Sequence, residues 1–410
     1  MNHLDIAHLD IGIAGCGPAG LACALLLHRG GHRVTLYEQF DEPRPIGSGL
    51  MIQPTGLAVL DRLGLAARTI AAGSRVERLL GLNENGKMVL DARYAELSAP
   101  GTFGIGIHRA QLFDLLYGAV LAAGITVRTQ SQVARCTLDR EKRILHFADG
   151  TASAPHDLVI DALGLHSPLA EATGRVLDYG ALWATLDWPD SGPFDPHRLE
   201  QRYRAARQMV GVLPLGHGKL AFFWSIKAQD LPAWQASGLD EWKHKVLALW
   251  PECACLLEQI SDADQLTFAR YAHRTVPHPV STRMVQIGDA WHSASPQLGQ
   301  GANMALLDAW ALSEGLRLGT TLPDALRQYH ALRADHVKLY QFLTDWLTPL
   351  YQSDAALPAA VRDRLLAPVS RIWPVTRIQS ALVAGLFGAP LPLLGLDVPD
   401  YGKHTITHLP

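Results

Sequence analysis

The sequence is poor in cysteine, nearly balanced in charge and free of long apolar runs. Five cysteines scattered over 410 residues are too few to build the disulfide framework of a small secreted domain. The formal net charge is -3, from 36 Lys and Arg against 39 Asp and Glu, and binding to nucleic-acid phosphates needs a clear basic excess. We therefore expect a small-molecule partner and no nucleic acid.

The sequence also lacks a targeting segment and a metal-binding pattern. Residues 1–10 are polar, without the apolar core of a signal peptide, and no run of about 18 apolar residues could span a membrane. Cys253 and Cys255 are one residue closer together than in the usual zinc half-site, and no histidine pair has a convincing metal spacing on a helix. We expect a cytoplasmic protein that binds no metal.

The composition is that of a globular chain with a sizeable core. Apolar residues make up 48% and charged residues 18%, which excludes a mainly disordered chain. At about 150 residues per domain, this length predicts two or three domains or one large discontinuous unit.

A glycine fingerprint lies near the start of the chain. A short apolar strand over residues 9–14 is followed by an apolar helix over 21–28 and a second strand over 33–38 that ends in Glu38. The turn between the first strand and the helix carries Gly15, Gly17 and Gly20. Strand, Gly-x-Gly-x-x-Gly, helix, strand and acid in this order are typical of a dinucleotide-binding βαβ unit.

Each residue of the fingerprint has a physical reason. Gly15 allows a tight turn, Gly17 lets the backbone approach a pyrophosphate, and Gly20 permits close packing of the helix on the strand. The helix N-terminus then directs N–H groups at the phosphates. Glu38 can accept hydrogen bonds from a ribose diol and would repel a 2′-phosphate. The alternative is a glycine-rich turn without a ligand.

The rest of the chain divides by composition. Helices are expected from Pro54 and from Arg109, and strands over 126–129, 133–137, 143–147 and 157–161. Residues 179–283 are rich in Trp, Pro and strand-like runs, which indicates an inserted mixed sheet that binds substrate. The nucleotide fold resumes with a strand over 284–287, and a helix begins at Gly301.

Three separated motifs together resemble a known family. They are the glycine fingerprint with Glu38, the pair His108-Arg109, and the segment Gly288-Asp289-Ala290-Trp291-His292 followed by Pro296-x-x-Gly299-Gln300-Gly301-Ala302-Asn303. In this order, over roughly residues 8–345, the chain resembles the group A flavoprotein monooxygenases. These single-component aromatic hydroxylases include the p-hydroxybenzoate, salicylate and ubiquinone-pathway hydroxylases.

The resemblance implies an α/β fold of the p-hydroxybenzoate hydroxylase type. A Rossmann-like FAD-binding domain would span residues 1–178, with about 80–105 contributing to the substrate domain. The mixed β-sheet substrate domain would span 179–283, and the second part of the FAD-binding domain 284–345. A C-terminal helical tail would follow over 346–410.

The resemblance also implies residue roles. Arg109 would reach the FAD pyrophosphate, the backbone of Val133 the adenine, and Asp289 the ribityl hydroxyls. Pro296 and Gly299 would lie near the flavin ring, while the helix N-terminus and the Asn303 amide meet its pyrimidine edge. The full expected FAD-binding set is Gly15, Gly17, Pro18, Ala19, Gly20, Glu38, Gln39, Gly49, Arg109, Val133, Gly288, Asp289, Pro296, Gly299, Gln300, Gly301, Ala302 and Asn303.

Bland alternatives stand beside these roles. Arg109 could be a surface arginine at a helix start, Val133 plain core, and Asp289 a helix or turn cap. His292 is expected to cap or pack locally rather than to act as a base. No catalytic side chain is assigned, because the flavin carries the chemistry.

The implied activity is that of an FAD-dependent monooxygenase, an oxidoreductase that uses O2 and NAD(P)H. A flavin C4a-hydroperoxide would hydroxylate a small aromatic or quinone-precursor substrate. One alternative is an FAD-dependent dehydrogenase or oxidase that does not use NAD(P)H; another is a non-redox binding protein. The chain departs from the family where Leu163 replaces an acid linked to FAD phosphate and NAD(P)H use, which puts the reductant in doubt.

The C-terminal region allows two interpretations. A helical pattern covers about 322–354, and Arg362, Arg364, Arg371 and Arg377 then alternate with apolar residues. Residues 360–396 could contact a membrane surface from the cytoplasmic side. The other interpretation is packing over the substrate domain or against a second copy, so that the protein is a monomer or a homodimer.

Overall fold

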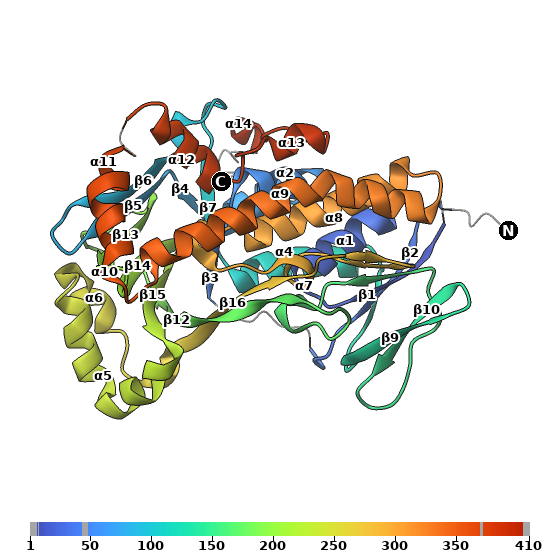
Figure 1. Cartoon of the computed structure of the whole chain (residues 1–410), viewed down its shortest axis with the longest axis horizontal. Coiled ribbons are helices and arrows are strands. Elements are labelled where there is room, and N and C mark those ends of the chain that lie inside the picture. Colours follow the sequence, from blue (N-terminus) through green and yellow to red (C-terminus); the bar gives the residue numbers. More distant parts are fainter. Residues whose placement is uncertain (1–5, 7, 43–47, 370–371, 405–410) are drawn as a thin grey trace, which may run out of the picture.

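The computed structural model describes residues 6, 8–42, 48–369 and 372–404, and Figure 1 shows their arrangement. A six-stranded sheet in the order β17-β18-β11-β1-β2-β8 forms the right-hand half in this view. Its neighbouring strands are parallel except β17 beside β18. The strands are β1 (Asp10–Ala14), β2 (Arg33–Tyr37), β8 (Thr126–Arg128), β11 (Leu158–Asp161), β17 (Val280–Ser281) and β18 (Met284–Gln286).

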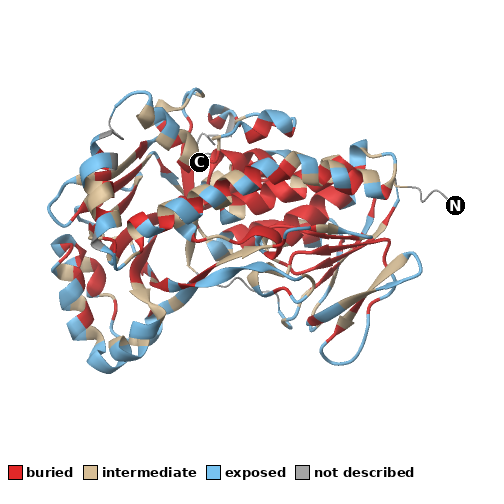
Figure 2. Ribbon diagram, in the orientation of Figure 1, coloured by how far each residue is buried: buried red, intermediate tan, exposed pale blue. Residues whose placement is uncertain are grey.

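Apolar helices cover this sheet and form the largest core. Figure 2 shows the buried residues concentrated in the sheet and in the helices packed on it. The helices of this half are α1 (Pro18–Arg29), α2 (Pro54–Arg62), α3 (Ala66–Ala72), α4 (Arg109–Ala122), α7 (Asp289–His292) and α8 (Gly301–Leu318). The βαβ unit predicted around the first glycines is confirmed, and so are the helices predicted from Pro54, Arg109 and Gly301.

A second, seven-stranded sheet has the order β16-β12-β15-β14-β13-β5-β6. Its strands are β5 (Arg78–Asn83), β6 (Met88–Arg93), β12 (Thr173–Asp187), β13 (Arg198–Arg204), β14 (Gln208–Gly216), β15 (Lys219–Lys227) and β16 (Thr267–Thr275). Residues 78–93 thus join a sheet otherwise built from 173–275. The domain limits given above stay a prediction.

The two faces of this sheet have different neighbours. Leu182, Phe222 and Trp224 pack on the outer face with Trp242, under α5 (Leu231–Leu247) and α6 (Ala254–Leu257). Strand alternation sends the adjacent residues, such as Phe223, to the opposite inner face. That inner face packs toward a three-stranded sheet, β3-β7-β4, made of β3 (Gly49–Ile52), β4 (Ser74–Val76) and β7 (Gly104–His108).

Glycines allow the small sheet to approach the inner face closely. A Cβ on Gly106 would overlap the carbonyl oxygen of Pro214, and a Cβ on Gly49 would lie 2.5 Å from the Leu215 side chain. Ser48 and Thr185 add a hydroxyl–hydroxyl hydrogen bond of 2.9 Å. The two large sheets are therefore joined by direct packing through the small one.

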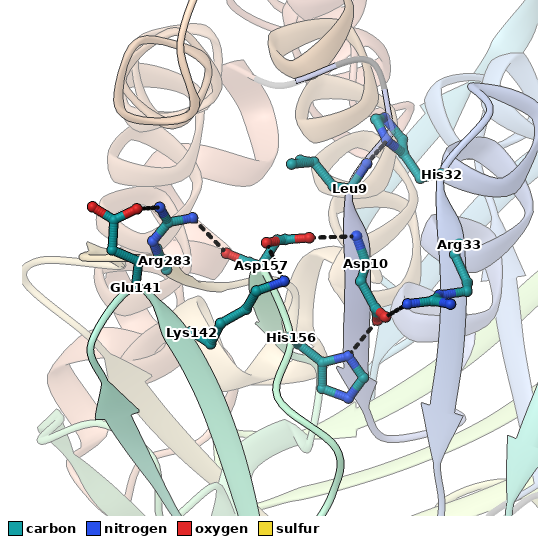
Figure 3. A network of polar contacts seen from close by, with 9 residues as sticks. All are labelled: Leu9, Asp10, His32, Arg33, Glu141, Lys142, His156, Asp157 and Arg283. Atoms are coloured by element: carbon teal, nitrogen blue, oxygen red, sulfur yellow. Dashed lines mark hydrogen bonds and ion pairs between the residues drawn. The ribbon is translucent and has the colours of Figure 1, made fainter. Parts of the chain in front are cut away.

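A β-hairpin projects from the six-stranded sheet and is held by charged side chains. It consists of β9 (Val133–Asp139) and β10 (Lys142–Phe147). Lys142 pairs with Asp157 at 2.7 Å, and Asp157 accepts the backbone N–H of Asp10 in β1 (Figure 3). The carboxylate of Asp10 in turn bonds with Nδ1 of buried His156 at 2.6 Å. This network fixes the hairpin to the amino-terminal end of β1.

The long helix α9 (Leu322–Tyr351) runs beside α8 and continues toward the seven-stranded sheet (Figure 1). The helical pattern predicted over about 322–354 is confirmed, and the predicted domain limit between 345 and 346 lies within this continuous helix. No helix within the described ranges has the length and apolarity to cross a membrane. The tail contains α10 (Ala356–Val361), a π-helical turn (Arg362–Leu366), α11 (Ala367–Val369), α12 (Val375–Val383), α13 (Pro390–Leu393) and α14 (Tyr401–His404).

Short 3-10 turns complete the chain. They are Tyr94–Glu96, Gly164–His166, Ala228–Asp230, Pro251–Cys253, Ala263–Gln265 and Pro296–Leu298.

Candidate cofactor site

The first glycine turn leaves one open position between two crowded ones. Gly15 has φ +105°, and a Cβ there would lie 2.5 Å from the Ala162 carbonyl oxygen. A Cβ on Gly20 would overlap the carbonyl oxygen of Gly15. At Gly17, which precedes α1, no described atom lies within 4 Å of the Cβ position. The turn therefore presents a bare helix N-terminus to open space, as a phosphate group requires.

Glu38 closes this turn from the end of β2. Its Oε2 accepts the N–H of Cys16 at 3.1 Å, and its Oε1 accepts the N–H groups of Gln39 and Phe40 at 2.8 and 3.2 Å. These three donors occupy most, but not all, of the acceptor capacity of a carboxylate. The acid is thus held beside the glycine turn with room for a further hydrogen bond.

The middle motif lies where β7 passes into α4. Arg109 is the first residue of α4, its side chain is exposed, and its N–H donates to the Ser48 carbonyl at 2.8 Å. Ser48 precedes Gly49, so these two predicted positions are adjacent. Val133 begins β9 and is buried in a cluster with Tyr37, so its side chain is core, as the bland alternative had it.

The second glycine segment meets the first. Gly288 has φ +59°, and a Cβ on it would lie 3.2 Å from the Cβ atoms of both Ala19 in α1 and Ala305 in α8. Asp289 follows, exposed, and a Cβ on Gly301 would lie 3.8 Å from its Oδ1. Segments almost 270 residues apart thus pack directly against each other.

The N-terminus of α8 is also open. Pro296–Leu298 forms a 3-10 turn that ends at Gly299, whose φ is +63° and whose Cβ position has no described atom within 4 Å. Gln300 precedes α8 and makes no side-chain cap with the residues described. The first N–H groups of α8 are therefore available to an electron-rich ligand edge, together with the positive end of the helix dipole.

The predicted role of the Asn303 amide needs correction. Asn303 is fully buried; its Oδ1 accepts the N–H of Gln53 at 2.8 Å, and its Nδ2 donates to the carbonyls of Met51 and Gly299 at 3.0 and 3.1 Å. Both amide atoms are therefore committed to protein groups. Asn303 fixes β3 and the Gly299 turn to α8 rather than reaching a flavin with its side chain.

Gln300 connects the same turn to the C-terminal tail. Its Nε2 donates to the Val383 carbonyl at 2.7 Å, and a Cβ on Gly385 would lie 2.7 Å from its Oε1. Tyr340 of α9 donates to the Leu382 carbonyl at 3.0 Å. The tail from residue 382 thus packs on the loop that leads into α8.

The segment around Leu163 is held by its own hydrogen bonds. Asp161 is buried; it accepts the Leu163 N–H at 3.1 Å and the Ser167 hydroxyl at 2.6 Å. Burial raises the pKa of Asp161. Arg274 donates to the carbonyls of Leu165, Ser167, Ala170 and Ala290. Asp161 is thus a structural acid facing inward and no replacement for an exposed acid at 163.

Two buried charged residues of this region, Asp308 and Arg333, were not predicted. Asp308 and Arg333 pair at 2.7 Å, and Asp308 also bonds with His292 Nε2 at 2.6 Å. His292 is thus tied to a residue sixteen positions away, and its ring also packs locally against Trp291, as predicted, with 5.0 Å between the ring centroids. A lone acid within the apolar run of α8 was the available signal in the sequence.

These residues fit FAD. The open position at Gly17 suits a pyrophosphate on the α1 N-terminus, and Glu38 suits the adenosine ribose. Asp289 can accept from ribityl hydroxyls, and the α8 N-terminus can face the pyrimidine edge. The cradle is made of positions that a Cβ would fill or crowd, which is what a closely fitted cofactor requires.

Comparison with known proteins agrees with this geometry. Residues 8–341 match a family described as FAD binding domain. The chain is 28% identical over 395 residues to 6-methylpretetramide 4-monooxygenase of Streptomyces rimosus, which covers 90% of each chain. It is 26% identical over 336 residues to an FAD-dependent urate hydroxylase of Klebsiella pneumoniae, covering 80% of this chain and 86% of the relative.

Solved structures share the fold. The structure of Klebsiella pneumoniae HpxO complexed with FAD and uric acid matches with a TM-score of 0.78 at 21% identity. The match covers 92% of this chain and 97% of that one. The tetrameric form of 2-methyl-3-hydroxypyridine-5-carboxylic acid oxygenase has a TM-score of 0.74 at 22% identity, covering 88% and 97%.

Proposed function

We propose that the chain, which belongs to the FAD-binding-domain family and is an FAD-dependent monooxygenase of the aromatic hydroxylase type, acts on a neutral, planar aromatic substrate. In the proposed reaction it hydroxylates this substrate with O2 and NAD(P)H. The observation that carries the substrate class is an uncharged aromatic surface on the inner face of the seven-stranded sheet. Bound FAD supplies electron storage and oxygen activation.

The protein's own residues bind and orient the cofactor. The N–H groups at the start of α1 would hold the pyrophosphate, with Arg109 as a bidentate cation. The N–H groups at the start of α8 would stabilise negative charge at the pyrimidine edge of the flavin. Asn303 contributes by holding that helix end against β3.

The proposed substrate surface consists of Trp183, Phe223 and Gly211. The three are direct cross-strand partners on β12, β15 and β14. The Trp183 and Phe223 rings stack at 4.7 Å, and a Cβ on Gly211 would overlap the Phe223 ring. Together they form an apolar platform whose Trp183 ring is partly exposed, and we propose that an aromatic substrate ring stacks there.

The platform has no charged neighbour in the middle of these strands. The inner-face positions around it are Ala181, Thr185, Met209, Leu213, Leu215, Ala221 and Ser225. These strand positions themselves would offer a buried substrate carboxylate no cation to offset its desolvation. The surface therefore favours a neutral ring over a benzoate-type substrate.

A matched ligand pair tests this preference. We expect 2-naphthol to bind the purified holoenzyme with a dissociation constant at least tenfold lower than that of 6-hydroxy-2-naphthoate, which differs by one carboxylate. The change in flavin absorbance on titration measures both constants. Trp183→Ala should weaken 2-naphthol binding about tenfold, whereas Trp224→Ala, on the outer face under α5, should lower stability alone. Equal affinity for both ligands would contradict the assignment.

Oxygen labelling separates the proposed activity from a dehydrogenase or oxidase. With ¹⁸O2 and a turned-over substrate, one labelled oxygen atom should enter the product. Substrate-dependent bleaching of the flavin without NAD(P)H, and no label in the product, would favour the alternative.

The reductant is proposed to be NAD(P)H, with reduced efficiency. Leu163 is half-buried against the cluster of Val133 and Phe147, so its side chain offers no acceptor at the position of the family acid. Anaerobic mixing with NADH and NADPH should bleach the flavin band near 450 nm. Absence of bleaching with either, with or without substrate, would exclude this reductant.

Only part of the segment 360–396 is exposed enough for the proposed membrane contact. Val383, Leu391 and Leu394 of the predicted 360–396 segment are buried, while Ile372 and Trp373 are exposed; Arg371 lies outside the described residues. A cytoplasmic location and a monomeric or homodimeric state remain proposals. Sedimentation with phosphatidylglycerol vesicles, compared for wild type and Trp373→Ser, tests whether this turn binds lipid, and light scattering gives the oligomeric state.

A further inference from the structure

One buried acid connects the two halves of the second cofactor motif. Asp308 lies in α8 and is fully buried. Its Oδ2 accepts the backbone N–H of Gly288 at 2.8 Å and pairs with His292 Nε2 at 2.6 Å. Its Oδ1 accepts Nε of Arg333 at 2.7 Å. The turn that carries Asp289 is therefore hydrogen-bonded to a carboxylate twenty residues further along the chain.

The carboxylate is kept ionised from the side of α9. Arg333 is also fully buried, and its Nη1 bonds with Nδ1 of His336 at 2.9 Å. Burial alone would raise the pKa of Asp308, but His292 and Arg333 outweigh it and hold that pKa below its ordinary value. Burial and the charge of Arg333 lower the pKa of His336 to about 3. At physiological pH, Asp308 is thus charged and His336 is neutral.

His292 extends the contact to the N-terminus of α8. It lines a cavity of about 20 Å³ together with Gln300, Gly301 and Tyr340. Asp308 therefore supports the Gly288 turn by a direct hydrogen bond. Through its bond with His292 it also supports one wall of the cavity that Gln300 lines. Both are parts of the proposed flavin cradle.

A contribution to stability alone does not explain the buried pair of Asp308 and Arg333. A buried ion pair contributes little net stability compared with apolar residues of the same volume, whereas it constrains geometry strongly. Gly288 has φ +59°, outside helix and strand, so its buried N–H needs an acceptor supplied by a side chain. Asp308 meets that need with a charged acceptor, which also gives the shorter and stronger bond.

We propose that Asp308 is a positioning residue for the flavin. It fixes the Gly288–Asp289 turn and, through His292, the base of the α8 N-terminus, so that the ribityl and pyrimidine contacts keep one relative geometry. Arg333 keeps the carboxylate charged and oriented. The inference rests on the placement of FAD against Asp289 and Gly301.

A charge-free double variant separates positioning from folding. Asp308→Leu combined with Arg333→Met removes both buried charges and leaves apolar groups of similar size. We expect a folded protein by circular dichroism, with at least tenfold weaker FAD binding and a shifted visible band of the bound flavin. Trp310→Phe is the control, because it removes a hydrogen bond from the same helix to the Leu394 carbonyl and should leave FAD affinity within twofold.

A pair of His292 variants keeps the proposal testable if the double variant does not fold. His292→Phe removes the donor to Asp308, whereas His292→Gln retains an amide donor. We expect Phe to weaken FAD binding about tenfold and to change the flavin reduction potential, and Gln to recover most of both losses. Equal behaviour of Phe and wild type, or a folded double variant with wild-type affinity and spectrum, would overturn the proposal. A wild-type protein that bound no FAD would instead contradict the cofactor placement itself.

Discussion

The open position at Gly17 gives the sharpest test of the cofactor site. A Cβ there meets no described atom within 4 Å, and the residue has φ −72°, which alanine adopts readily. Gly17→Ala should therefore change the stability of the cofactor-free protein by less than about 1 kcal/mol, since a lost N-cap preference and a less flexible unfolded chain oppose each other. If a pyrophosphate occupies the space, the added methyl group must displace it.

The expected size follows from mass action. We expect Gly17→Ala to raise the dissociation constant of FAD about a hundredfold, which corresponds to about 2.7 kcal/mol of binding free energy. FAD at a hundred times the wild-type dissociation constant stabilises the protein by about 2.7 kcal/mol, and the variant would retain only about 0.4 kcal/mol of this. Urea unfolding with and without FAD, together with fluorescence titration of FAD, measures both quantities on the same protein.

Gly20→Ala is the matched control. Its Cβ would overlap the Gly15 carbonyl oxygen, so it should lose stability in the cofactor-free protein as well. Wild-type FAD affinity in Gly17→Ala would refute the assignment of this space to the pyrophosphate, and so would a large loss of stability without FAD.

Three further outcomes are expected. Gly385→Ala, at φ +77° and 2.7 Å from Gln300 Oε1, should cost about 1–3 kcal/mol of unfolding free energy and weaken FAD binding, as thermal melting and FAD titration would show. Burial raises the pKa of Asp157, but Lys142 and the Asp10 N–H outweigh burial and lower that pKa. The ion pair therefore stabilises the fold at neutral pH, and this stabilisation is lost as the pH falls below about 4. In urea unfolding, Asp157→Asn should cost about 0.5–1 kcal/mol at pH 7 and less at pH 3.5. Leu163→Asp should speed anaerobic flavin reduction by NAD(P)H in stopped flow, and an unchanged rate would show that the lost acid does not limit this step.

The glycine motifs were predictable because their reasons are local. The positive φ of Gly15, Gly288 and Gly299 and the crowding at Gly20 follow from turns a few residues long. The βαβ order around them is equally local, and its elements were found within a few residues of their expected limits.

The platform and the buried cluster depend on pairings distant in sequence. Trp183 meets Phe223 only through the register of β12 and β15, and no periodicity in the sequence fixes that register. Asp308 meets Arg333 only because α8 and α9 lie side by side. The side chain of Asn303 shows the same limit, because its partners Met51 and Gln53 lie some 250 residues earlier.

The helix α9 has a consequence for how the two halves of the molecule can vary. Arg333 touches the acid below the Gly288 turn, while Thr348 bonds with Ser295 at 2.9 Å and Tyr351 lies against Tyr203 of β13. About four helical turns separate these contacts, and one inserted residue would rotate the far end by about 100° and advance it by about 1.5 Å. The length of this helix therefore contributes, beside the direct packing of the sheets, to the distance and the angle between the place where electrons would be stored and the surface where the ring would lie. An insertion in α9 should therefore change this relation, because the contacts on its two sides would no longer lie on the same face of the helix.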